Sequence, residues 1–277
     1  MKIPTNGTQL HVQSTGSGPP VVLLHGWLGS SYHWRKLVPL LANRFQVIVP
    51  DMRGYGESAK PETGYDGETL ADDIQGVLDA LGASRPIVVG HDMGALPALL
   101  LAARPAAAAR GLVYIDEPLP GYNLDKFTAF TDQNPFVYWW FAFNAQPHVP
   151  AMMWSGREAE LVDYFLTAMV AHPTVITAED KAEYVRGLRK PGGLAASFGW
   201  YREVLRTGHQ IREATRERLT VPVLALNGQY GHPEVGEQMK LVADNVTSVT
   251  LERCGHLCAE ERPVEVAEAI AEFAASL

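Results

Sequence analysis

Ile87-Val88-Val89-Gly90-His91-Asp92-Met93-Gly94-Ala95 carries the strongest structural signal in the chain. A short apolar run leads into Gly-X-Asp-X-Gly, and an apolar segment of helical character follows. The glycines on either side of Asp92 allow close packing and the unusual backbone angles of a tight turn. A sharp strand-to-helix turn of this kind lifts its central side chain above a sheet. We therefore predict that Asp92 stands at the tip of such a turn; the alternative reading is an ordinary helix N-cap.

Short apolar runs alternate with helical patterns outside this turn. Buried strands are predicted at residues 21–24, 47–49, 87–89, 112–115, 223–226 and 249–251. One amphipathic helix is predicted from Leu70 to Leu81, with Thr69 as its N-cap and Gly82 as its stop, and another after Pro263. This alternation predicts an α/β fold, in which helices cover a mostly parallel sheet.

The alternating pattern breaks between about Pro118 and Arg218, where aromatic residues and prolines cluster and no convincing strand is visible. We interpret this stretch as a helical insertion over the carboxyl ends of the strands, where open α/β sheets place their ligands. The predicted organisation is a core domain formed by residues 1–117 and 219–277, with a helical cap of residues 118–218.

Length, composition and charge limit the possible partners. The chain has 277 residues, 47% of them hydrophobic and 19% charged, which is ordinary for a soluble globular protein. The net charge of −8 argues against a nucleic-acid partner. The N-terminus has no apolar signal core, and no apolar stretch approaches the ~20 residues that span a bilayer. Because Cys254 and Cys258 are the only cysteines, we expect no disulfide framework, a cytoplasmic location and no membrane partner.

An aspartate at the tip of the turn restricts the chemistry. A carboxylate, with a reference pKa of about 3.9, is ionised at neutral pH and needs no base to become nucleophilic. Its attack on an ester or amide would give an anhydride, whereas its attack on a saturated carbon with a leaving group gives an alkyl-enzyme ester. Epoxides and alkyl halides supply such carbons. Activated water must then hydrolyse the ester.

The best candidate for the base that activates this water is His256. Cys254-Gly255-His256 follows the last predicted strand and precedes the final helix. The His256 imidazole is therefore expected to lie above Asp92, close to its carboxylate. Cys254, His256 and Cys258 could also suggest a metal. Nothing completes a zinc ligand set around them, so we expect neither a metal nor a cofactor.

The base also needs a carboxylate to orient it, and this acid can follow either of two strands. The segment after Val223–Leu226 has no aspartate where one would be expected. The run Leu112–Ile115, in contrast, is followed directly by Asp116 and Glu117. We select Asp116 as the acid and keep Glu117 in reserve.

His25-Gly26-Trp27 follows the first strong strand, where a loop can supply one backbone N–H to an oxyanion hole. We assign the N–H groups of Trp27 and Met93 to this role, in which a donor is typically worth roughly 3–4 kcal/mol. His25 precedes a glycine in a tight turn and is expected to be structural, with a substrate contact as its other reading.

Together these residues resemble the epoxide hydrolase and dehalogenase branch of the α/β-hydrolases. The matching pieces are residues 25–27, 51–58, 90–94 and 254–256, with Glu261-Arg262-Pro263 behind the last of them. The resemblance covers nearly the whole chain, although the insertion matches only loosely. The resemblance implies the α/β-hydrolase fold, and its specific signal is the aspartate in the turn.

Three members of this branch compete. Haloalkane dehalogenases usually carry Trp directly after the nucleophile, where this chain has Met93. Fluoroacetate dehalogenases place arginines just after it, whereas the next arginine here is Arg104. Epoxide hydrolases need neither feature, although they commonly carry Phe-Pro after His-Gly, where this chain has Trp27-Leu28.

Epoxide hydrolases use cap hydroxyl groups, usually of Tyr, to donate hydrogen bonds to the opening epoxide oxygen. The resemblance implies that Tyr201 is the main donor. For the second donor it points to Trp139 or Trp140, with Tyr138 as the alternative, since an indole N–H can donate a hydrogen bond. Trp140, Tyr138 and Phe136 are expected to contact the substrate; cap core packing is the other reading of this aromatic run.

The resemblance implies an enzyme that hydrolyses an epoxide to a vicinal diol through an Asp92 ester, with water as co-substrate and no cofactor. The aromatic cap favours an apolar epoxide and leaves an aromatic or polycyclic one open. The expected partner is a small-molecule substrate, and the sequence leaves open whether the protein forms a homodimer. Two alternatives remain: a dehalogenase that uses the same Asp92–His256–Asp116 set, and a non-catalytic binding protein on the same fold.

Overall fold

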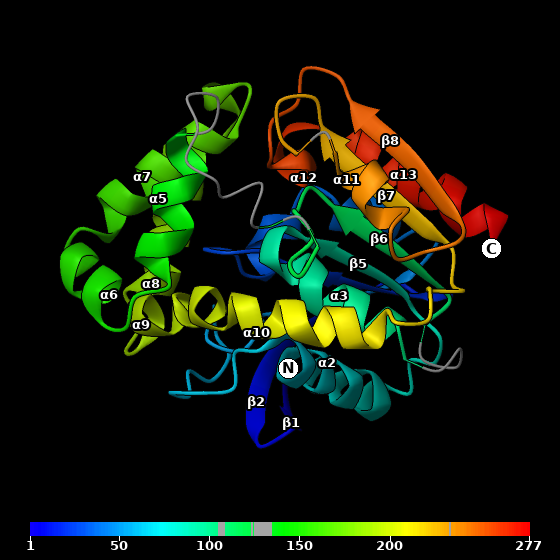
Figure 1. Cartoon of the computed structure of the whole chain (residues 1–277), viewed down its shortest axis with the longest axis horizontal. Coiled ribbons are helices and arrows are strands. Elements are labelled where there is room, and N and C mark those ends of the chain that lie inside the picture. Colours follow the sequence, from blue (N-terminus) through cyan, green and yellow to red (C-terminus); the bar gives the residue numbers. More distant parts are fainter. Residues whose placement is uncertain (105–108, 123, 125–134, 233) are drawn as a thin grey trace.

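The structure of the chain is a computed structural model. The structure describes residues 1–104, 109–122, 124, 135–232 and 234–277, and of residues 135–138 it describes the backbone alone. In the described residues, eight strands form one sheet in the order β1-β2-β4-β3-β5-β6-β7-β8 (Figure 1). The strands are β1 (Lys2–Thr5), β2 (Thr8–Thr15), β3 (Pro20–Leu24), β4 (Gln46–Pro50), β5 (Ile87–His91), β6 (Gly111–Ile115), β7 (Val223–Gly228) and β8 (Val246–Leu251). Strands β3 to β8 pair in parallel, which confirms the predicted α/β class.

The six predicted strands are all present, but the sequence analysis missed the antiparallel pair β1 and β2. The reason is physical. β1 alternates exposed and buried residues, and β2 is likewise buried on one face only, so neither forms the continuous apolar run of a strand buried on both faces. Asn6 and Gly7, both at positive φ, form the two-residue turn between them. Asn-Gly is a strong hairpin signal and could have revealed the pair.

The helical elements have these bounds: η1 (Ser31–Trp34), α1 (Val38–Leu41), α2 (Gly67–Leu81), η2 (Asp92–Gly94), α3 (Ala95–Ala102), α5 (Pro135–Asn144), α6 (Val149–Trp154), α7 (Glu158–Met169), η3 (Pro173–Val175), α8 (Ala178–Leu188), α9 (Gly193–Ser197), α10 (Gly199–Ala214), α11 (Val235–Met239), α12 (Cys258–Glu261) and α13 (Pro263–Ser276). The described residues contain no helix with the length and apolar character that crossing a bilayer requires.

Helix α2 starts earlier than the sequence analysis predicted. Its N-cap is Asp66, whose carboxylate accepts a hydrogen bond from the Thr69 backbone N–H, so the assignment of Thr69 as the N-cap was wrong. The prediction counted back from the first apolar residue, Leu70, and overlooked the first helical turn. The predicted stop at Gly82 is confirmed, because Gly82 adopts the left-handed conformation with φ 62°.

Both faces of the sheet are covered, and each has its own apolar cluster. Val22 and Leu24 of β3 point to the cluster that includes α2 and α3, whereas Val21 and Leu23 point to the cluster that includes α1 and α13. Two-sided burial explains why the central strands read as continuous apolar runs.

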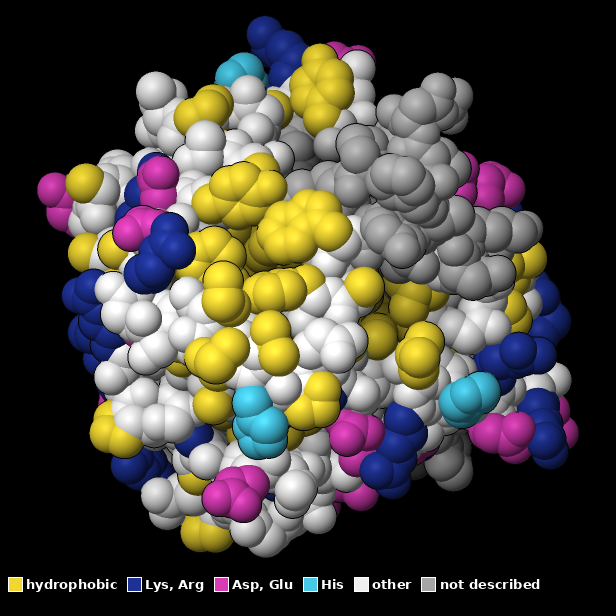
Figure 2. Space-filling model, turned by 60° about the vertical axis from the view of Figure 1, so that its left-hand side comes forward, with side chains coloured by type: hydrophobic (Ala, Val, Ile, Leu, Met, Phe, Trp, Pro, Cys, Tyr) yellow, Lys and Arg dark blue, Asp and Glu magenta, His cyan; other side chains and the backbone are white. Residues whose placement is uncertain are grey.

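Helices are the only regular structure in the described residues between β6 and β7 (Figure 1). They contact the loops at the carboxyl ends of the strands: Trp27 Nε1 and the Tyr55 hydroxyl both donate hydrogen bonds to the Ser197 carbonyl oxygen. Figure 2 views the molecule from the side on which these helices lie and shows hydrophobic side chains gathered there. Met152 of α6 and Tyr164 of α7 are among the exposed apolar residues.

Candidate active site

Asp92 stands at the turn between β5 and α3, as predicted. Its φ is +52°, a left-handed conformation that side chains other than glycine rarely adopt. The turn also packs closely against the loop after β3, because a Cβ on Gly94 would lie 2.3 Å from the His25 carbonyl oxygen. Residues held in rarely populated backbone conformations are typical of functional sites. Here the conformation fixes the orientation of the Asp92 carboxylate.

The Asp92 carboxylate contacts two other segments of the chain. Its Oδ1 accepts a hydrogen bond from the Trp27 backbone N–H at 2.7 Å, and its Oδ2 lies 2.9 Å from His256 Nε2. Burial opposes ionisation, but the hydrogen bond and charge of His256 outweigh it and lower the pKa of Asp92 to about 2. These bonds reach away from α3, which favours a reactive carboxylate over a simple helix cap.

The loop that carries His256 is held by backbone and side-chain hydrogen bonds. The His256 N–H donates to the Met169 carbonyl oxygen at 2.8 Å, and the His91 ring donates from Nε2 to the His256 carbonyl oxygen at 2.8 Å. Glu261 accepts from the backbone N–H groups of Gly255 and Ala171. The sequence analysis gave Glu261 no role, although it lies only five residues after His256.

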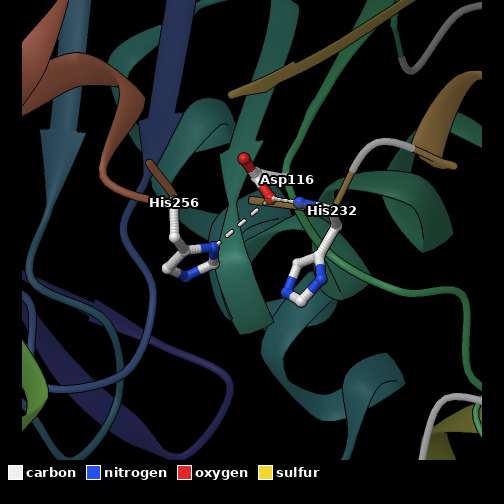
Figure 3. Close-up of side chains that lie close together, drawn as sticks. All are labelled: Asp116, His232 and His256. Atoms are coloured by element: carbon white, nitrogen blue, oxygen red, sulfur yellow. Dashed lines mark hydrogen bonds and ion pairs between the residues drawn. The ribbon is translucent and has the colours of Figure 1, made fainter. Parts of the chain in front are cut away.

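Asp116 follows β6 and faces the other side of the imidazole (Figure 3). Its Oδ1 lies 3.5 Å from His256 Nδ1, and its two oxygens accept hydrogen bonds from the backbone N–H groups of His232 and Gly228 at 2.6 and 2.8 Å. Burial opposes ionisation of Asp116, but interaction with the His256 side chain, followed by the charges of His232 and His256 and the Gly228 N–H, lowers its pKa. A Cβ at Gly231 would lie 2.1 Å from Asp116 Oδ2, so glycine is needed where that loop passes the carboxylate.

His256 therefore lies between two carboxylates, one on each ring nitrogen. Burial alone would lower its pKa, but the hydrogen bonds and charges of Asp116 and Asp92 raise it well above 6.5. The structure thus brings together Asp92, His256 and Asp116. The reserve acid, Glu117, does not contact the imidazole through any hydrogen bond in the described residues.

A cavity of about 60 Å³ opens on Asp92. Its lining residues come from the sheet loops and from the helices between β6 and β7: Asp92, Met93, Glu117, Pro118, Trp140, Phe141, Phe165, Met169, Tyr201, His232 and His256. Inside it, Trp140 Nε1 donates a hydrogen bond to the Tyr201 hydroxyl oxygen at 2.8 Å. Burial and the charge of Asp92 raise the pKa of Tyr201 well above 10. The cavity thus combines a carboxylate, a phenol and an imidazole.

The two adjacent tryptophans differ in position. Trp140 is buried in the cavity, whereas Trp139 is 37% exposed and is not among the residues that line it. The cavity lining therefore includes Trp140 and not Trp139, so Trp140 is the better placed of the two predicted donors. Tyr138 and Phe136 belong to α5, but their side chains lie outside the described residues.

The remaining predicted residues lie at the turn. Trp27 donates its backbone N–H to Asp92, and Met93 lines the cavity. The reading of His25 as a substrate contact was wrong. This buried ring accepts from the Met52 N–H at Nε2 and donates from Nδ1 to the Gly26 carbonyl oxygen, so backbone groups occupy both nitrogens.

Asp116, His232 and His256 are the described residues whose ligand atoms lie close enough together to suggest a metal site (Figure 3). Their contacts do not fit one well. Backbone N–H groups occupy both Asp116 oxygens, and His256 Nε2 is turned toward Asp92. Zinc sites need three or four open ligand positions. This cluster suits an oriented imidazole better than a metal ligand set.

Comparisons with known proteins agree with this geometry. A family model of the alpha/beta hydrolase fold matches residues 19–263. The chain is 33% identical to a soluble epoxide hydrolase from Corynebacterium sp. (strain C12), over 98% of this chain and 96% of that protein. Two solved structures are similar throughout. Cfl2 from Burkholderia cenocepacia has a TM-score of 0.94 at 32% identity, over 98% and 94% of the two chains. The epoxide hydrolase CorEH has a TM-score of 0.91 at 32% identity, over 100% and 98%.

Proposed function

The chain belongs to the alpha/beta hydrolase fold family, and we propose that it is an epoxide hydrolase that forms a covalent ester on Asp92. The observation that carries this proposal is an ionised carboxylate, with its pKa lowered to about 2, in a cavity that also holds the Tyr201 hydroxyl. The 33% identity to a soluble epoxide hydrolase along nearly the whole chain supports the same substrate class.

In the first step, Asp92 Oδ2 attacks one epoxide carbon and the carbon–oxygen bond of the ring breaks. Tyr201 donates a hydrogen bond to the oxygen that leaves the carbon. Because Trp140 donates to the same phenol, it holds the hydroxyl in place and favours the build-up of negative charge beside it. The product of this step is an alkyl ester of Asp92.

In the second step, His256 takes a proton from water, and the resulting hydroxide attacks the ester carbon. Asp92 Oδ1 already accepts from the Trp27 N–H, so it becomes the oxyanion of the tetrahedral intermediate. The Met93 N–H is the second donor in this proposal. Collapse of the intermediate releases a vicinal diol and restores the carboxylate.

The helices between residues 118 and 218 act as a cap in this proposal, since they bring Trp140, Phe165 and Tyr201 to the cavity. A largely apolar lining favours an apolar substrate over a charged one. We also propose a cytoplasmic location. Cys254 and Cys258 are both free thiols, as expected in a reducing compartment.

A single turnover in ¹⁸O-labelled water tests the proposal. With enzyme in excess over an aryl-substituted epoxide, we expect a diol without the label, because its new oxygen comes from Asp92. The label should instead appear in a peptide containing Asp92, measured by mass spectrometry. A labelled diol in the first turnover would mean direct attack by water and would reject the ester. Ester formation with alkyl halides, and with no epoxide, would support a dehalogenase instead.

Tyr201→Phe is expected to slow formation of the ester roughly 10²-fold and to leave its hydrolysis unchanged. The reason is that the phenol contacts the leaving epoxide oxygen, which no longer takes part once the ester has formed. Rapid-quench mass spectrometry measures the two rates separately. Tyr164→Phe on α7, whose ring is partly exposed, is the matched control. An unchanged rate of ester formation in Tyr201→Phe would remove Tyr201 from the mechanism.

A further inference from the structure

A second carboxyl group, that of Glu117, lines the same cavity as Asp92 but has no role in the two steps above. We propose that Glu117 is a further catalytic residue, which gives a proton to the epoxide oxygen while Asp92 opens the ring. This inference rests on the proposed epoxide hydrolysis and assigns the source of the proton that the new hydroxyl group requires.

Glu117 is buried within the cavity wall, and its carboxyl makes no hydrogen bond to any described residue. Its side chain is 3% exposed, and Oε1 has no hydrogen-bonding partner in the described part of the chain. The preceding residue, Asp116, has both oxygens occupied by backbone N–H groups. Buried polar groups in native proteins are nearly always paired, and an unpaired one at an active site calls for a functional explanation. An epoxide oxygen in the cavity would supply the missing partner.

None of the neighbouring hydrogen-bond donors in the cavity is a good source of this proton. The Trp140 N–H is already directed to the Tyr201 hydroxyl at 2.8 Å, so it is not aimed at the substrate. His232 also lines the cavity, but burial lowers its pKa to about 4 and keeps the ring neutral. A neutral imidazole is a poor proton source. Tyr201 can donate a hydrogen bond, but giving up its proton would leave a buried phenolate.

Glu117 and Tyr201 are the two cavity groups that could give up a proton, and a carboxyl is ordinarily the more acidic of the two types. Burial, followed by the charge of Asp92, raises the pKa of Glu117 well above 4.5, which favours the protonated carboxyl group. The same two causes raise the pKa of Tyr201. Because the pKa of an ordinary carboxyl lies about six units below that of an ordinary phenol, the proposal assigns the proton to Glu117 and the supporting hydrogen bond to Tyr201.

The charge of Asp92 couples this proton to the reaction. The titratable groups that face Glu117 are Asp92, Asp116, Tyr114, Tyr201, His232 and His256. Of these, Asp92 loses its negative charge when it becomes an ester. Burial still favours the protonated carboxyl, but the repulsion from Asp92 then disappears, so the proton becomes easier to release when the alkoxide needs it.

The protons balance over the cycle. The epoxide carbon–oxygen bond breaks, the alkoxide takes the Glu117 proton, and a Glu117 carboxylate remains beside the His256 imidazolium. No direct hydrogen bond joins these two side chains in the described residues, so in this proposal the co-substrate water carries the imidazolium proton to Glu117. This leaves His256 neutral and able to act as a base. His256 then takes a proton from water during ester hydrolysis, and the resting charges are restored. The sum is epoxide plus water to diol.

The test measures the rate of ester formation in the His256→Gln background, where the ester persists. Adding Glu117→Gln should lower this rate by roughly 10²-fold or more, because an amide can donate a hydrogen bond but cannot give up a proton in this way. With Glu117 present, the rate should fall as pH rises through the pKa of the carboxyl group. With Gln at this position, that fall should be absent.

Matched variants separate proton transfer from packing. Glu158→Gln changes another buried glutamate, on α7 outside the cavity, and should leave both the rate and its pH profile unchanged. Glu117→Leu removes the hydrogen bond as well as the proton. If Glu117→Gln forms the ester at the parent rate, or keeps the fall at high pH while only Glu117→Leu is slow, Glu117 is no proton donor. If the parent forms no ester with any epoxide, the proposed function itself is rejected, and this inference with it.

Discussion

Asp92→Asn is expected to abolish turnover of epoxides, with a loss of at least roughly 10⁴-fold. Asparagine is the sharpest replacement because it tolerates the φ of +52° at this position better than most residues, so the turn should survive. An amide has no negative charge and cannot form the alkyl ester. The variant therefore removes the nucleophilic carboxylate and retains the conformation of the turn.

The measurement is diol formation under saturating epoxide, together with the mass of the intact protein. No mass increase should appear with any epoxide. Asp92→Ala should be equally inactive but less stable, since alanine at positive φ is strained. Gly187→Ala, whose new Cβ would meet no atom within 4 Å, controls for expression and handling. Substantial turnover by a folded Asp92→Asn protein would show that water attacks the epoxide directly.

His256→Gln is expected to trap the ester. In the resting enzyme, Asp92 and Asp116 hold the pKa of His256 well above 6.5. When Asp92 becomes an ester, one of these two charges is lost, the pKa of His256 falls and the neutral imidazole can accept a proton from water. Glutamine fills similar space but cannot serve as a base at neutral pH. Ester hydrolysis should slow roughly 10³-fold, while the ester still forms.

Intact-protein mass spectrometry checks this outcome. One equivalent of epoxide should add to His256→Gln, and digestion should locate the added mass on the peptide that contains Asp92. His209→Gln, an exposed histidine of α10, is the matched control and should show rapid turnover without an adduct. If His256→Gln turns over without accumulating an ester, another group activates the water and His256 loses its assigned role.

Several parts of the site could be predicted because they are encoded by neighbours in the sequence. The turn at Asp92 needs glycines on both sides, and the loops of His256 and Asp116 each follow a recognisable apolar strand. Parallel strands end at the same edge of a sheet, so residues that follow them are expected to meet. The structure brings these three side chains together, with 2.9 Å between His256 and Asp92 and 3.5 Å between His256 and Asp116.

Other parts depend on contacts between distant segments. Trp139 and Trp140 have the same chemistry and adjacent positions, and only the rotation of α5 against α10 decides which one faces Tyr201. Glu117 appeared as a spare acid for His256. Its place in the cavity follows from the chain direction after β6 and from the helices packed over it.

The amino-acid sequence by itself determined the α/β class, the reactive turn and the identity of its three central side chains, because local apolar patterns and glycine positions encode them. The tertiary structure alone decided which side chains share the cavity and which donors are already engaged. It also placed the Glu117 carboxyl, which makes no hydrogen bond to the described residues, in the same cavity as Asp92. Burial and hydrogen bonding are properties of packed surfaces, and those surfaces come from segments far apart in the chain.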